Sequence, residues 1–206
     1  MDNTSEVVLT RPRLDTDARA LLFTDARTAN TFADTPVTDT ELAEIWELAK
    51  WPPTAANTQP LRVLYIRTPE GKQRLLPLIS DGNRDKTAAA PVTAVLAVDT
   101  QYHEHIPQLF PHKPDLRDVF AADSAMRDGS GQFNAALQAG YFLLAVRAVG
   151  LAAGPMAGFD RAGVDAEFFP DGQFRSLLVV NIGHPGENPW FDRLPRLPHT
   201  ASVHWA

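Results

Sequence analysis

The chain has 206 residues, of which 44% are hydrophobic and 21% charged, which is typical of a soluble globular protein with one sizeable core. Its 19 basic and 25 acidic side chains give a net charge of −6, which argues against nucleic acid and anionic membranes as partners. The lack of cysteine excludes disulfides, thiolate catalysis and cysteine-ligated metals. The first residues show no secretory signal, and no apolar stretch is long enough for a membrane span, so we expect a cytoplasmic protein.

The first third of the chain predicts two helices and a strand. Residues 15–26 have an apolar pattern typical of a helix. Thr38 and Glu41 form a capping box, hydroxyl first and carboxylate three residues later, which predicts the start of a second helix. Residues 61–68 alternate as expected for a strand.

The middle of the chain predicts a buried strand and a long helix. Residues 69–80 have a helical pattern, and the nearly continuous apolar run at 90–99 is typical of a buried central strand. Residues 100–131 are irregular and predict a partly helical excursion that would suit a lid. Residues 133–150 are apolar almost all round, so we expect a central, buried helix, as core or as dimer interface.

The last part predicts a short helix, a strand and an extended tail. Asp160 would cap a helix that runs toward Phe169, and residues 174–186 form the last predicted strand. No repeat or low-complexity linker interrupts the chain, so we expect one domain spanning residues 1–206. The order of elements indicates an α/β or α+β fold.

Common cofactor and catalytic motifs are incomplete or missing. Residues 129–131 begin like a dinucleotide fingerprint, but Asn134 stands where the third glycine belongs and no strand precedes them. Lys86 ends a phosphate-loop pattern that lacks its glycines, and no G-x-S-x-G elbow exists. Residues 103–105 (HEH) have no third ligand nearby, so we predict a surface loop and no metal site.

The stretch WPPTAANTQP, residues 51–60, places polar groups on a rigid backbone. Its prolines fix φ and remove donors, and the residue before Pro60 is expected to be extended. Thr54, Asn57 and Gln59 would display one hydroxyl and two carboxamides, which suit a polar, flat, heteroatom-rich ligand. On this stretch alone, side chains that only cap their own turn are the simpler interpretation.

Five short stretches stand in order along the chain. They are residues 27–30 (RTAN), 53–60 (PTAANTQP), 83–86 (NRDK), 154–160 (GPMAGFD) and 196–198 (RLP). Each is weak alone, but the ordered set resembles the FMN-dependent nitroreductase family over almost the whole chain. GPMAGFD, NIGHPG and DRLPRLP are most similar to the malonic semialdehyde reductase branch of the pyrimidine-utilisation pathway.

The resemblance implies a three-layer α+β fold, in which helices flank a mainly antiparallel sheet, and an interlocked homodimer with FMN in two interface clefts. It implies an FMN-dependent oxidoreductase that uses NADPH or NADH and transfers hydride through flavin N5 by ping-pong kinetics. The branch implies reduction of malonic semialdehyde to 3-hydroxypropionate. A broad nitroaromatic or quinone reductase, and a flavin-binding protein without turnover, are the alternatives.

The resemblance assigns the first and last stretches to the phosphate end of FMN. Arg27 and Arg196 would hold a phosphate bidentately, which lysine cannot do. Thr28 and Asn30 would serve phosphate or ribityl oxygens, although the family usually has a basic residue at the position of Asn30. Arg193 belongs to the candidate set, but Arg196 fits the family's final Arg-Leu-Pro better, and Arg193 alone is interpreted as structural.

In the family, the proline-flanked segment reaches the flavin from the neighbouring subunit. Thr54 here keeps the hydroxyl of the usual serine. The candidates from this segment are Pro53, Thr54, Ala55, Asn57 and Gln59.

The flavin ring is assigned to the two remaining stretches. Asn83 and Lys86 match the family's Asn-x-x-Lys, and the Lys86 ammonium beside N1 and the C2 carbonyl would stabilise the reduced flavin. Backbone N–H groups of residues 155–158 would approach N5 and O4. These residues are Pro155, Met156, Ala157 and Gly158. Many relatives carry Glu at the position of Ala157, so the role assigned there is one of the backbone.

No side chain is expected to act as catalytic acid or base, because FMN carries the hydride chemistry and solvent can supply the proton. A carboxylated aldehyde would favour a local cation over the open face of the flavin. Arg84 and the arginines between Arg117 and Arg127 are the candidates for that cation.

Overall fold

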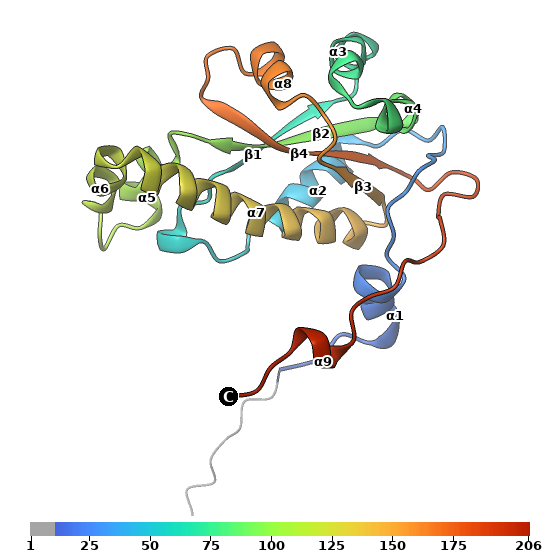
Figure 1. Cartoon of the computed structure of the whole chain (residues 1–206), viewed down its shortest axis with the longest axis horizontal. Coiled ribbons are helices and arrows are strands. Elements are labelled where there is room, and N and C mark those ends of the chain that lie inside the picture. Colours follow the sequence, from blue (N-terminus) through green and yellow to red (C-terminus); the bar gives the residue numbers. More distant parts are fainter. Residues whose placement is uncertain (1–10) are drawn as a thin grey trace, which may run out of the picture.

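The computed structural model describes residues 11–206, so residues 1–10, which carry the expectation about a secretory signal, lie outside the described residues. Three layers are visible in Figure 1, with a sheet between two sets of helices. The helices α2 (Asp39–Ala49) and α7 (Ser124–Ala148) cover one face of the sheet. The other face carries α3 (Pro69–Leu75), α4 (Asp81–Ala89) and α8 (Arg161–Phe168).

The sheet has the order β1-β2-β4-β3, and every neighbouring pair is antiparallel. Its strands are β1 (Leu61–Ile66), β2 (Val92–Asp99), β3 (Ala152–Met156) and β4 (Phe174–Gly183). All of β2 is buried, as its apolar run predicts. Ala94 and Leu96 face the α2 and α7 side, whereas Val95 and Ala97 face the α3 and α8 side, which follows the period of two in a strand. The three-layer α+β architecture is therefore confirmed.

Two elements of the layered body, α4 and β3, are not predicted by the sequence. Helix α4 has the polar sequence DGNRDKTAA, which shows no apolar stripe. Strand β3 consists of Ala, Gly, Pro and Met, so it lacks the β-branched and aromatic residues that mark strands. Pro155 is compatible with β3 because this strand lies at the edge of the sheet.

The excursion between β2 and α7 is helical in part, as expected. It contains a 3-10 turn at Tyr102–His105, then α5 (Ile106–Leu109) and α6 (Leu116–Ala122). The predicted surface loop at residues 103–105 is wrong for His103, which is only 5% exposed. Burial lowers the pKa of His103 below its ordinary value. Within residues 11–206, no group of three His, Asp or Glu side chains could hold a metal ion.

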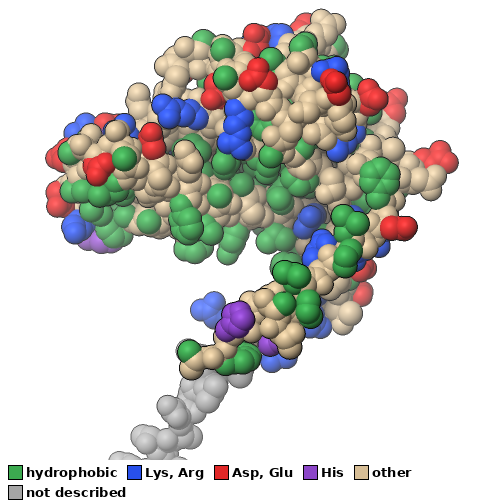
Figure 2. Space-filling model, viewed as in Figure 1, with side chains coloured by type: hydrophobic (Ala, Val, Ile, Leu, Met, Phe, Trp, Pro, Cys, Tyr) green, Lys and Arg blue, Asp and Glu red, His purple; other side chains and the backbone are tan. Residues whose placement is uncertain are grey.

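Helix α7 begins nine residues before the predicted start, because the Asp123 side chain accepts a hydrogen bond from the backbone N–H of Met126 at 2.9 Å. The expectation that this helix is buried all round is wrong for the single chain. One side packs on the sheet and α2, but Phe133 is 66% exposed and Leu137 and Tyr141 are exposed beside it. Figure 2 shows hydrophobic side chains along the lower surface of the body, facing the space beside the terminal segments. No described helix is long and apolar enough to span a bilayer.

The ends of the described chain run away from the layered body. The predicted first helix is present as α1 (Thr16–Arg19), which continues as a π-helical turn at Ala20–Thr24. The tail after β4 is extended, as expected, until the short helix α9 (His199–Ser202). Figure 1 shows the two segments passing close to each other beyond one end of α7.

We expect Thr38→Ala to lower the free energy of unfolding by about 1 kcal/mol. The Thr38 hydroxyl accepts from the backbone N–H of Glu41 at 3.2 Å, and the Glu41 carboxylate accepts from the Thr38 backbone N–H at 2.7 Å. The Thr38 backbone N–H and then the Thr38 hydroxyl, which also donates to the Glu41 carboxylate at 2.7 Å, lower the pKa of Glu41, with a smaller contribution from His184. The folded-state pKa lies below the unfolded one, so the stabilisation is present at neutral pH and is lost as pH falls below 4.5.

Urea unfolding at pH 7 and at decreasing pH would measure this difference, with Thr38→Ser as the control that keeps the hydroxyl. If the difference in free energy of unfolding between Thr38→Ala and the parent were the same at all pH values, the Glu41 carboxylate would take no part in the cap.

Candidate functional site

Two segments far apart in sequence are bonded side by side and form one wall of the candidate site. The backbone N–H of Asn30 donates to the carbonyl of Pro189 at 3.0 Å. The hydroxyl of Thr31 donates to the carbonyl of Glu187 at 2.7 Å. The segment before α2 is thereby fixed against the segment that follows β4.

A cavity of about 390 Å³ lies between these segments and α4. Four cationic side chains and one carboxylate line it, a net of three positive charges in a chain whose overall charge is −6. The cations are Arg27, Lys86, Arg193 and Arg196, and the other lining residues are Ala26, Thr28, Asn30, Phe191, Asp192 and Leu194. The lining therefore favours an anion.

The three guanidinium groups donate only to backbone carbonyls. Arg27 donates to Phe191 at 3.1 Å, Arg193 to Ala26 at 3.3 Å, and Arg196 to Leu194 at 3.0 Å. Over residues 11–206, neither these arginines nor Lys86 makes an ion pair with a carboxylate. Their charges are left for a group that is not part of this chain, and guanidinium pairs well with phosphate.

Helix α4 joins this cavity to the segment after β3. The Asn83 carboxamide donates to the carbonyl of Gly158 at 3.3 Å, and the Ser80 backbone N–H donates to the same carbonyl at 3.1 Å. A Cβ on Gly158 would lie 2.7 Å from Nδ2 of Asn83, so only glycine fits without displacement. A Cβ on Gly154 would lie 3.2 Å from the Ala29 carbonyl oxygen, which places β3 against the Arg27–Asn30 segment.

The 51–60 segment lies elsewhere in the same chain. Its Ala55 backbone N–H donates to Oδ1 of Asn134 at 2.8 Å, in the first half of α7. Arg147, at the other end of α7, donates to the Leu22 carbonyl close to the cavity wall. Thirteen helical residues separate Asn134 from Arg147, a length of about 20 Å. One chain therefore does not bring Pro53, Thr54, Ala55, Asn57 and Gln59 to the cavity.

The backbone of this segment differs from the expected extended form. Gln59, before Pro60, has φ of 43°, and Ala56 and Asn57 have φ of 50° and 51°. The Thr54 hydroxyl accepts from the Gln59 backbone N–H at 3.2 Å, which favours the turn over extension. Three non-glycine residues in the left-handed region are costly, and such strain is concentrated at functional sites.

The carboxamides of this segment are engaged within the chain. Asn57 donates to the carbonyl of Leu109 in α5 at 2.9 Å, and Gln59 donates to Oδ1 of Asn57 at 2.8 Å. The simpler interpretation, in which these side chains only cap their own turn, therefore holds for Thr54 and Gln59 in the single chain but is wrong for Asn57, whose partner lies in α5.

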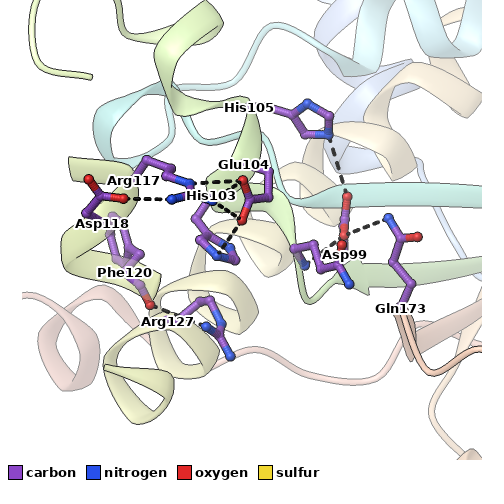
Figure 3. A network of polar contacts seen from close by, with 10 residues as sticks. Asp99, His103, Glu104, His105, Arg117, Asp118, Phe120, Arg127 and Gln173 are labelled. Carbon is purple, nitrogen blue, oxygen red and sulfur yellow. Dashed lines mark hydrogen bonds and ion pairs between the residues drawn. The ribbon is translucent and has the colours of Figure 1, made fainter. Parts of the chain in front are cut away.

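The candidate substrate cations have differing environments. Arg84 pairs with Asp81 at the start of α4. Arg117 is neutralised by Glu104 and Asp118, as Figure 3 shows. The structure therefore does not bring these two arginines to the cavity as free charges.

Arg127 is the candidate without a carboxylate partner within residues 11–206. It donates to the Phe120 carbonyl at 3.4 Å (Figure 3). It lines a second cavity, of about 190 Å³, together with Arg161 and Arg175. This second cavity shares no lining residue with the first.

Four of the lining residues are not predicted from the sequence. Phe191, Asp192 and Leu194 lie beside the chosen arginines of the tail, and Ala26 directly precedes Arg27. Adjacency to those arginines is the only signal that marks them in the sequence.

Comparison with known proteins agrees with this architecture. The model of the nitroreductase family matches residues 24–184. A Streptomyces coelicolor protein, provisionally named an NADH dehydrogenase/NAD(P)H nitroreductase, is 62% identical over 195 residues, which cover 95% of this chain and 96% of the relative. A Leptothrix cholodnii protein with the same provisional name is 52% identical and covers 89% of this chain and 93% of its own length.

Among solved structures, a provisionally assigned nitroreductase from Exiguobacterium sibiricum, crystallised with FMN, is similar in fold. Its TM-score is 0.83 at 18% identity, and the match covers 94% of this chain and 99% of that one. The residues matched by the family model and the identity to the curated relatives establish the family. The chain belongs to the nitroreductase family.

Proposed function

We propose that the protein is an FMN-dependent NAD(P)H oxidoreductase and that it works as a homodimer. The observation that carries this proposal is the 390 Å³ cavity, where four cations that have no carboxylate partner within residues 11–206 converge from three parts of the chain. The nitroreductase-family membership and the FMN in a structural neighbour support the same cofactor.

The donor set of the cavity fits FMN. Arg27 and Arg196 would hold the phosphate bidentately, with Arg193 beside them, because guanidinium geometry matches phosphate oxygens. Thr28 and Asn30 would bond phosphate or ribityl oxygens. The close approach of Gly154 and Gly158 to their neighbours leaves backbone, without side chains, on that side of the site.

When bound, FMN supplies hydride transfer in two half-reactions, from NAD(P)H and then to an acceptor. The protein contributes charge and orientation. Lys86 places an ammonium where negative charge increases on reduction of the cofactor. Asn83 fixes α4 to Gly158, so the lysine and the residue 155–158 backbone keep a constant geometry.

We further propose that the second subunit completes the site with Pro53, Thr54, Ala55, Asn57 and Gln59. Within one chain, the segment contacts α7 at Asn134, and the cavity wall contacts α7 at Arg147, 13 residues further along the helix. The exposed apolar stripe of α7 gives a surface on which two chains could meet. The strained, proline-braced backbone of the segment suits a site that must be rigid before a ligand arrives.

The purified protein tests this proposal directly. We expect a yellow protein that bleaches with NADPH or NADH and regains its colour when an acceptor is added. Yellow protein that never bleaches would identify a flavin-binding protein without turnover. Colourless protein that takes up no FMN would refute both functions.

For the acceptor, we propose malonic semialdehyde, reduced to 3-hydroxypropionate, on the basis of the GPMAGFD, NIGHPG and DRLPRLP stretches. A carboxylate that pairs with a fixed cation would orient the carbonyl carbon, and orientation of this kind lowers the barrier. We expect NADPH oxidation to be at least about tenfold faster with malonic semialdehyde than with propanal, the equivalent of about 1.4 kcal/mol.

A benzoquinone and a nitroarene complete the comparison under the same conditions. A large advantage for either would replace the malonic semialdehyde assignment with a broad quinone or nitroaromatic reductase, as the names of the curated relatives suggest.

A further inference from the structure

A half-buried lysine lies behind the helix that carries Asn83 and Lys86. The ammonium of Lys72, in α3, donates to the carbonyl of Thr87 in α4 at 2.7 Å and to the hydroxyl of Thr93 in β2. Figure 1 shows α3 and α4 together over the same face of the sheet. Burial lowers the pKa of Lys72 to about 8.

The Thr87 carbonyl needs this donor because of the sequence that follows. In a continuing helix it would bond the N–H of residue 91, but residue 91 is a proline and has none. A carbonyl left without a donor at a buried helix end would be costly. The lysine also brings positive charge to the negative end of the α4 dipole, which is a favourable arrangement.

The hydrogen bonds close into a ring that connects α3 to α4, β2 and β4. The Thr93 hydroxyl bonds Oδ1 of Asn181 at 3.0 Å, and Nδ2 of Asn181 donates to the Thr87 hydroxyl at 3.1 Å. Thr87, Thr93 and Asn181 are all 0% exposed. The Thr87 hydroxyl also lies 3.6 Å from the Met156 sulfur, so the ring touches β3 as well as α4.

We propose that Lys72 is a positioning residue for the flavin site: by anchoring the end of α4, it holds Lys86 and Asn83 where the cofactor needs them. Lys86 directly precedes Thr87 in α4, so a displacement of the Thr87 carbonyl displaces Lys86 as well. This inference rests on the proposed FMN function, and it assigns a role to a half-buried lysine that does not line the cavity.

The central test is the affinity for oxidised and reduced FMN, measured by fluorescence titration and by the midpoint potential. Lys72→Met should raise the dissociation constant of reduced FMN about tenfold more than that of oxidised FMN, because the displaced Lys86 matters most to the reduced cofactor. Lys113→Met, which removes an exposed lysine from the α5–α6 excursion, is the charge-matched control and should leave both constants unchanged.

A double-mutant cycle separates positioning from an independent effect. In the Lys86→Met background, Lys72→Met should no longer change the ratio of the two constants. Additive effects of the two substitutions, or an unchanged ratio in the folded single variant, would overturn the proposal. If Lys72→Met does not fold, Thr93→Val removes one partner of the ammonium with little change in volume, and it should shift the ratio in the same direction.

A readout without FMN keeps this proposal distinct from the proposed function. The Ala90 backbone N–H donates to the Lys86 carbonyl at the end of α4, and its hydrogen exchange should accelerate in Lys72→Met. Unchanged exchange would overturn the anchoring role even if the protein binds FMN. If the parent protein does not bind FMN, the proposed function is refuted, but hydrogen exchange at Ala90 still tests whether Lys72 anchors α4.

The pH dependence of stability gives a second readout of the same kind. The folded-state pKa of Lys72 lies below its ordinary value of 10.5, so stability should rise with pH between about 8 and 10.5. Lys72→Met should remove that rise. The charged groups on the neighbouring elements make no ion pair with Lys72: Arg74 of α3 pairs with Glu167 of α8, Glu70 and Asp85 do not contact the ammonium, and Lys86 lines the cavity. The partners from β2 and β4, Thr93 and Asn181, are uncharged.

Discussion

Replacing Leu137 by aspartate is expected to convert the proposed dimer into a monomer that does not hold FMN. Phe133, Leu137 and Tyr141 are spaced by four residues on α7, and all three are exposed in the single chain. A contiguous apolar stripe on a stable protein indicates an interaction surface. Two-fold pairing would bury one aspartate from each chain without a partner, and each such charge costs several kcal/mol.

We expect the dimer dissociation constant to rise at least about a thousandfold, since that factor corresponds to roughly 4 kcal/mol. Sedimentation across a range of concentrations measures it, and the flavin absorbance at the monomer boundary shows whether cofactor stays bound. Ala166→Asp, on α8 in the opposite layer, adds the same charge and should leave the dimer intact. A folded, flavin-loaded monomer of Leu137→Asp or of the parent would contradict the proposal that two chains complete the site.

Lys86→Met should lower the midpoint potential of bound FMN by about 30 to 60 mV, which equals roughly 1.4 to 3 kcal/mol for two electrons. Lys86 lines the cavity on α4 and has no carboxylate partner within residues 11–206, so its charge is available to the cofactor. The substitution should weaken the binding of oxidised FMN little and that of reduced FMN strongly, because reduction adds negative charge to the cofactor.

Potentiometric titration with a reference dye measures this shift, and stopped-flow reduction by NADPH should slow in parallel. Lys50→Met is a suitable control, because Lys50 pairs with Glu47 in α2 and does not line the cavity. Equal potentials in Lys86→Met and the parent would exclude Lys86 from the flavin site.

The elements that were predicted correctly carry their signal in neighbouring residues. The capping box at Thr38 and Glu41 specifies its helix by neighbouring residues alone, and the apolar run of β2 specifies a strand covered on both faces. Helix α4 was not predicted because its sequence is polar and it packs on the sheet through the buried polar ring around Thr87. Polar residues at Thr93 and Asn181, inside otherwise apolar strands, were the signal for that ring.

The residues of the candidate site were easier to predict than their arrangement. The ordered stretches identified Arg27, Lys86 and Arg196, and the structure gathers these three at one cavity. The same stretches could not show that residues 53–59 lie against the first half of α7, away from the cavity. That separation depends on long-range packing against Asn134 and Leu109, which no local pattern contains.

The pairing of the segment before α2 with the segment after β4 sets an order of events during synthesis. Arg27 is made early, but its partners at Phe191 and the bonds to Glu187 and Pro189 exist only once those residues have been added. At about 5 to 20 residues per second, that delay is roughly 10 to 30 seconds. The sheet and its helices can form in the meantime, whereas the wall of the cavity that joins Arg27 to the tail cannot. Cofactor capture should therefore follow translation of the tail, and ribosome-bound chains stalled before Pro185 should take up no FMN.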